Sequence, residues 1–169
     1  MRSVVRHVMM SEPVPPVSIA FGDFSRLKRV AVEAVSKRHP IGRFLLTEIE
    51  RATVYEPAFV PERCVRLDDW VTFRADENEP LESRVLVLPE GFRNSALHLS
   101  VLSPLGAALI GLHAGSRIHY VGFDGVPHIA MVENLDPPTG VISLLQRRSM
   151  RSAQRADNNN PDRPGPTAA

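Results

Sequence analysis

The sequence predicts an α+β fold, in which two short N-terminal helices precede one antiparallel, curved sheet of about five strands with a single short helix. Two observations predict it: apolar residues recur at helical spacing between residues 23 and 52, and short apolar runs between residues 64 and 135 are separated by turn signals. The chain has 169 residues, which is enough for one ordinary domain and an appendage.

Residues 17–55 are expected to form a helical hairpin. Asp23 can cap the first helix, and Pro40 ends it because proline has no backbone N–H to continue the ladder. A second helix is expected from about Ile41, and the short turn at 36–40 predicts antiparallel packing. The expected inward-facing residues are Phe24, Leu27, Val30, Ala31, Ala34 and Val35 in the first helix, and Ile41, Phe44, Leu45, Ile49 and Ala52 in the second.

Residues 64–146 are expected to form the sheet domain. Its predicted strands are 70–74, 84–88, 97–101, 118–121 and 128–132. Asp124-Gly125 is a strong hairpin signal between the last two strands. The acidic run at 76–79 lacks a calcium-loop pattern, so it is interpreted as a solvated turn between two strands.

One short helix is marked within this domain. Ser103 is a good N-cap, and Pro104 fits the first helical position, where its missing N–H costs nothing. Gly111 is placed to end the helix in the left-handed conformation, and Gly115 to turn the chain into the next strand.

The two ends of the chain are expected to be loose. Residues 1–16 are rich in proline and expected to be flexible, and residues 147–169 have too few apolar residues to offset the entropy of ordering. The tail carries Arg147, Arg148, Arg151 and Arg155, which allow weak, salt-dependent contact with nucleic acid, although a solubilising role is the simpler interpretation.

Composition excludes several functional classes. The net charge of +1 argues against a dedicated nucleic-acid-binding domain, and the single cysteine excludes an intramolecular disulfide and a multi-cysteine zinc site. No membrane-spanning segment is expected, and a cytoplasmic location fits these features. The six histidines lack metal-site spacing, and neither Cys64 nor Ser103 has the motif of a nucleophile. No catalytic, cofactor or metal site is therefore expected.

Residues 100–116 carry a family resemblance. The sequence Ser-Val-Leu-Ser-Pro-Leu-Gly-Ala-Ala-Leu-Ile-Gly-Leu-His-Ala-Gly-Ser resembles the C-terminal signature of the Gre transcript-cleavage factors, and more closely that of the Gre-like Rnk type, the regulators of nucleoside diphosphate kinase. The similarity extends upstream to His39-Pro40, residues 45–52 and residues 71–74, so it covers roughly residues 17–135.

The resemblance implies an FKBP-like domain that docks on the rim of the secondary channel of bacterial RNA polymerase, with the helical hairpin directed toward the channel. Carried over to this chain, the docking loop is Leu102, Ser103 and Pro104, with Leu102 where Gre factors often have an acidic residue. The hairpin tip contains Lys37, Arg38 and His39. From the residues alone, this tip is equally well a solvated helix end, whose cations favour the helix dipole.

Gre-type cleavage needs acidic residues at the hairpin tip to help hold a second Mg²⁺ near the polymerase metal. Residues 36–42 contain no carboxylate, so the chain is interpreted as a polymerase-binding regulator with no reaction of its own. Two alternatives remain open. One is an FKBP-like prolyl isomerase, for which the domain offers few aromatic residues; the other is a regulatory effect on nucleoside diphosphate kinase.

Overall fold

The computed structural model describes residues 13–61 and 63–138. Those up to Asp136 belong to one compact unit, and residues 137–169 are a separate unit. The tail arginines and His7 lie outside the described residues, as does most of the expected flexible N-terminus. No helix in the described part of the chain is long and apolar enough to cross a membrane.

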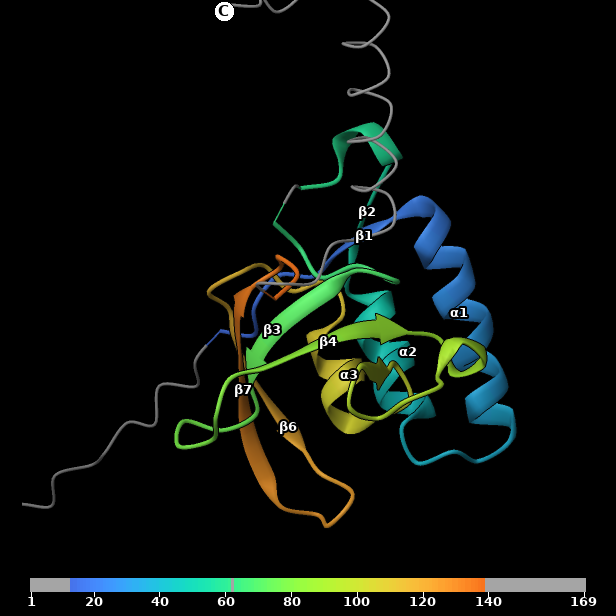
Figure 1. Cartoon of the computed structure of the whole chain (residues 1–169). Helices are drawn as coiled ribbons and strands as arrows, with labels where there is room; N and C mark the ends of the chain where they lie inside the picture. The colour runs from blue at the N-terminus through green and yellow to red at the C-terminus, as the bar shows by residue number, and fades with distance from the viewer. Residues whose placement is uncertain (1–12, 62, 139–169) are drawn as a thin grey trace, which may run out of the picture. The chain divides into compact units, whose positions relative to one another are not determined.

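The five predicted strands form one sheet in the order β5-β4-β3-β7-β6 (Figure 1). Their bounds are Trp70–Arg74 for β3, Glu82–Val87 for β4, His98–Ser100 for β5, Arg117–Val121 for β6 and Pro127–Asn134 for β7. A register shift between Thr72 and Phe73 marks a bulge in the β3–β7 pair, and such bulges bend a strand.

The sheet is mostly antiparallel, so the prediction of a fully antiparallel sheet is wrong at one edge. Strand β5 runs parallel to β4, with Val85 opposite His98. The connection at 88–97 includes the 3₁₀ turn η2, Pro89–Gly91, and returns the chain to the starting end of β4 before β5 begins. A tight hairpin turn would have given the antiparallel pair.

Both expected N-terminal helices are present as α1, Phe21–Ser36, and α2, Gly42–Glu50. Asp23 is not the N-cap: Ala20 occupies that position without a side-chain cap, and Asp23 lies in the first turn of α1. The helices contact each other. A Cβ on Gly42 would lie 2.7 Å from the backbone nitrogen of Val35, so glycine allows the close approach of the two helices.

A two-stranded parallel sheet that the sequence did not reveal flanks this helical pair. Strand β1, Ser18–Ala20, precedes α1, and strand β2, Thr53–Tyr55, follows α2. Strand β1 also joins the rest of the unit, because the amide of Ser18 donates to the carbonyl of Gly111 at 2.9 Å. A second 3₁₀ turn, η1, Pro57–Phe59, follows β2.

Helices and sheet share one hydrophobic core. The third helix α3, Pro104–Leu109, contacts β6 and β7 as well as α2, which in turn contacts α1 (Figure 1). Fully buried side chains come from every layer, and they include Leu27, Leu45, Ile49, Phe73, Leu86, Leu109 and Val132. The helical pair is therefore packed into the same core as the sheet.

Candidate functional site

A groove of about 340 Å³ lies between the helical pair and one end of the sheet. Its lining consists of Val30, Glu33, Ala34, Lys37, His39, Pro89, Glu90 and Leu102. This groove, named here the tip–loop groove, brings together Leu102 from the predicted docking loop and Lys37 and His39 from the predicted helical tip. Arg38, Ser103 and Pro104 do not line it.

The helix wall carries Glu33 and Lys37, and the opposite wall carries Glu90. Val30 and Ala34 are buried on the inner face of α1, and Lys37 and Glu33 lie at the exposed end. The ammonium of Lys37 donates to the carboxylate of Glu33 at 2.5 Å, and this hydrogen bond lowers the pKa of Glu33. This pairing is the common i,i+4 arrangement on a helix surface.

The turn between α1 and α2 is fixed mainly by its backbone. Arg38 has a φ of +55°, in the left-handed region that ends many helices. The amide of His39 donates to the carbonyl of Ala34 at 2.8 Å, and Nδ1 of His39 accepts from the amide of Ile41 at 3.2 Å. Arg38 is exposed and no carboxylate of the described residues lies within 4 Å of it, so its charge faces solvent.

The loop wall is built around the N-terminus of α3. The hydroxyl of Ser103 donates to the carbonyl of Ser100 at 2.7 Å and accepts from the amide of Gly106 at 3.0 Å, which confirms its predicted capping role. Pro104 is buried at the first helical position. Of the three residues in the predicted docking loop, Leu102 lines the groove, while Ser103 and Pro104 form the N-terminus of α3.

A close backbone approach also holds this wall. A Cβ on Gly106 would lie 2.0 Å from the carbonyl oxygen of Ser100, so no other residue fits there without moving the helix. At the other end of α3, Gly111 has a φ of +73°, as the sequence predicted. The motif that carries the family resemblance therefore encodes the packing of α3 against β5.

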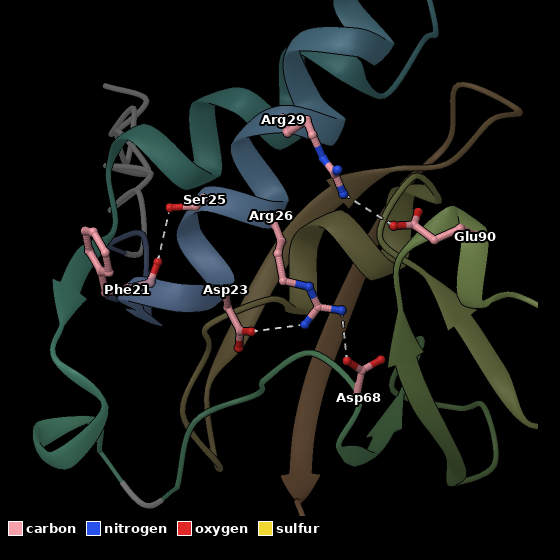
Figure 2. A network of polar contacts seen from close by, with 7 residues as sticks. All are labelled: Phe21, Asp23, Ser25, Arg26, Arg29, Asp68 and Glu90. Carbon is pink, nitrogen blue, oxygen red and sulfur yellow. Dashed lines mark hydrogen bonds and ion pairs between the residues drawn. The ribbon is translucent and has the colours of Figure 1, made fainter.

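Ion pairs connect α1 with the sheet beside the groove (Figure 2). Arg29 of α1 approaches Glu90 of η2 at 3.6 Å, and Arg26 approaches Asp68, before β3, at 3.1 Å. Arg26 also approaches Asp23 at 3.5 Å, although burial is the dominant effect on Asp23 and raises its pKa. All four partners of the two cross-links are substantially exposed, so each pair contributes little stability and mainly sets orientation.

Two polar pairs elsewhere had no signal in the sequence, because their partners are far apart along the chain. Ser18 Oγ lies 2.9 Å from Nε2 of His113. Nδ1 of His128 lies 2.6 Å from Oδ2 of Asp76, and the hydrogen bond raises the pKa of His128 and lowers that of Asp76. Asp76 therefore has a partner, although it lies in the predicted turn between β3 and β4 and its side chain is 40% exposed, and Glu77, Asn78 and Glu79 are exposed as expected.

Cys64 and the possible metal ligands are the remaining candidate reactive groups among the described residues. Cys64 is buried, and that burial raises the pKa of its thiol, which disfavours the thiolate. No group of three or more His, Cys, Asp or Glu side chains within residues 13–61 and 63–138 is arranged to hold a metal ion. What the groove offers is an apolar floor with charged side chains at its rim, which suits contact with another molecule.

Comparisons with known proteins agree with this geometry. The family model for the C-terminal domain of transcription elongation factors GreA/GreB matches residues 60–143. The "Regulator of nucleoside diphosphate kinase" of Escherichia coli (strain K12) is 36% identical over 95 residues, which are 56% of this chain and 70% of that protein. The protein of that name from Shigella flexneri gives the same values.

A solved structure supports the fold. The prokaryotic transcription elongation factor GreA/GreB from Nitrosomonas europaea aligns with a TM-score of 0.58 and 26% identity, over 72% of this chain and 99% of that one. Because the sequence identity with the curated relatives and the match of the C-terminal domain agree with this fold, the chain belongs to the Gre/Rnk-like family of transcription factors.

Proposed function

We propose that this chain is a regulator that binds bacterial RNA polymerase at the rim of the secondary channel and catalyses no transcript cleavage. The sheet domain, whose FKBP-like character is part of the proposal, docks through the Leu102 loop, and the turn between α1 and α2 is directed toward the channel. The observation that carries the proposal is the tip–loop groove, because it joins Leu102 with Lys37 and His39 on one surface.

Charge at the tip argues against cleavage. A second Mg²⁺ needs carboxylate ligands. Residues 36–42 contain none, and Lys37 and Arg38 would repel the ion. Glu33, the nearest acid on α1, is already paired with Lys37.

Length argues in the same direction. At 1.5 Å per residue, α1 spans about 24 Å and α2 about 14 Å. Leu27 of α1 and Leu45 and Ile49 of α2 are buried in the shared core, so only the last turn of α1, residues 37–41 and the first turn of α2 can enter a pore. Such a short arm is suited to occupying a channel entrance and competing with longer factors.

The isomerase alternative gains no support from the groove, since none of its lining residues is Phe, Tyr or Trp. The name of the curated relatives points to nucleoside diphosphate kinase. We propose that any effect of this chain on that kinase acts through transcription, so purified chain should leave the activity of purified kinase unchanged.

Binding to core RNA polymerase is the decisive measurement. Leu102→Lys should weaken binding at least about tenfold, as expected for a charge introduced into an apolar contact. The matched control is Leu97→Lys, at an apolar residue that is 48% exposed and does not line the groove. Equal affinity of wild type and Leu102→Lys, or cleavage of stalled RNA by a polymerase that requires this chain, would contradict the proposal.

A further inference from the structure

The turn between β6 and β7 exposes three large apolar side chains. Val121, Phe123 and Val126, named here the hairpin knob, are 57%, 66% and 47% exposed. The turn itself does not need them: Gly125 supplies the positive φ of +79°, and Oδ1 of Asp124 accepts from the amide of Val126 at 3.0 Å. Polar residues and glycine would build the same turn, so the apolar knob has no structural explanation.

The knob is held rigidly. The amide of Gly122 donates to the carbonyl of Val126 at 2.9 Å, and the amide of Gly125 donates to the carbonyl of Gly122 at 3.0 Å. At its base, His128 is hydrogen-bonded to Asp76 and stacked on Tyr120 with ring centroids 5.3 Å apart. A rigid apolar surface loses little entropy when it binds, which favours a role in association.

A complementary surface lies on the solvent side of α1. An open groove of about 570 Å³, the α1 groove, is lined by Phe24, Ser25, Lys28, Arg29, Val32, Glu33 and Ser36. Val32 is 52% exposed, whereas the core-facing stripe of α1 is formed by Leu27, Val30, Ala31 and Ala34. Of the two apolar side chains that line the α1 groove, Phe24 is half-buried against the core and Val32 is exposed to solvent.

A charged side chain lies beside each of the two apolar surfaces, and the two charges are opposite. The ammonium of Lys28 lies 5.7 Å from the centroid of the Phe24 ring, and no carboxylate of residues 13–61 and 63–138 lies within 4 Å of it. Asp124, beside the knob, has a side chain that is 59% exposed, and its Oδ1 lies 3.8 Å from Nε2 of His128. A single copy thus carries an apolar knob with a carboxylate and an apolar groove with a cation.

We infer that the chain forms a symmetric dimer in which the hairpin knob of each copy sits in the α1 groove of the other, with Asp124 facing Lys28. Direct packing of α1 on α1 would instead bring Lys28 and Arg29 of both copies together. Two-fold symmetry uses both knobs and both grooves, so association stops at two copies. Each half of this contact has one three-residue apolar knob and one ion pair, so we expect a dissociation constant between about 1 μM and about 1 mM.

Sedimentation equilibrium of the full chain tests this inference. Wild type should show a monomer–dimer equilibrium, which Phe123→Ser and Val32→Ser should each weaken at least about tenfold. Phe59→Ser is the matched control, because Phe59 in η1 is 75% exposed and belongs to neither surface. Circular dichroism establishes that each variant is folded.

Charge variants test the proposed pairing of Asp124 with Lys28. Lys28→Glu should weaken the dimer, and so should Asp124→Asn, which keeps the side-chain oxygen that accepts from Val126. A wild-type chain that stays monomeric up to about 1 mM overturns the inference. So does a dimer that Phe123→Ser leaves intact, or growth into open chains beyond two copies.

Discussion

The two walls of the tip–loop groove are built in different ways. The loop wall rests on a buried proline, a doubly hydrogen-bonded serine and a glycine whose Cβ would collide with a carbonyl. The helix wall ends in the exposed Lys37 and Arg38, with one surface ion pair. Packing therefore constrains residues of the loop wall, whereas residues of the tip are free to change charge, so the tip is where related chains can differ in activity.

The largest expected effect is on the loop wall. Gly106→Ala places a methyl group against the carbonyl oxygen of Ser100, so we expect the free energy of unfolding to fall by about 3 kcal/mol or more. Urea denaturation measures it. Gly22→Ala is the control, since nothing lies within 4 Å of a Cβ there and alanine favours the helix. Similar stabilities for the two variants would mean that the loop wall is as adaptable as the tip.

A smaller loss of folding stability is expected when the N-cap of α3 is removed. Ser103→Ala deletes the acceptor for the amide of Gly106 and should cost about 1 kcal/mol, with a lower melting temperature. Ser103→Thr keeps a hydroxyl and should recover much of the loss. An unchanged melting temperature for Ser103→Ala would show that solvent replaces the cap.

At the tip we expect substitutions to change polymerase binding and to leave the free energy of unfolding unchanged. Lys37→Ala with Arg38→Ala removes two exposed cations that hold no buried contact, so urea denaturation should match wild type. The double variant should compete less well with a cleavage factor for core polymerase. A clear loss of stability would contradict the contrast between the walls, and unchanged competition would remove the tip from the proposed function.

The smallest effect concerns the Asp76–His128 pair, outside both walls. Folding raises the pKa of His128 above its ordinary value of 6.5. The protonated His128 therefore stabilises the folded state fully below pH 6.5, and this stabilisation is lost as the pH rises through the folded-state pKa. Folding lowers the pKa of Asp76 below its ordinary value of 3.8. The ionised Asp76 therefore stabilises the folded state above pH 3.8, and this stabilisation is lost as the pH falls through the folded-state pKa. The destabilisation by His128→Gln should therefore be largest between these two pH values. Thermal melts across pH measure this, with His98→Gln as control because His98 accepts from the backbone amide of Arg93. Equal losses at pH 5 and pH 8 would contradict the prediction.

Local rules predicted much of the fold. Alternation and short apolar runs located the five strands of the main sheet. Helical spacing found the buried apolar residues of α1 and α2, but Phe24, Val35, Phe44 and Ala52 are only partly buried and the buried Glu48 was not expected. Serine, proline and glycine preferences fixed α3 and its ends, because those signals depend on neighbouring residues.

Features that depend on distant partners were missed. The parallel pairing of β5 with β4 and of β1 with β2 leaves no trace in a three-residue strand. Asp76 and His128 are 52 residues apart, so their pairing follows from the strand register. The sequence named Lys37, His39 and Leu102 separately, and only the packing of α1 beside η2 showed that they share a groove.

The parallel strands β1 and β2 clasp the base of the helical pair, since the amide of Thr53 donates to the carbonyl of Val17 and β1 is bonded to Gly111. Anchored this way, the arm can be lengthened by inserting matched helical turns on either side of residues 37–41, with no change to the clasp. The length of the helical pair would then be adjustable without any change to the surface by which the sheet domain docks.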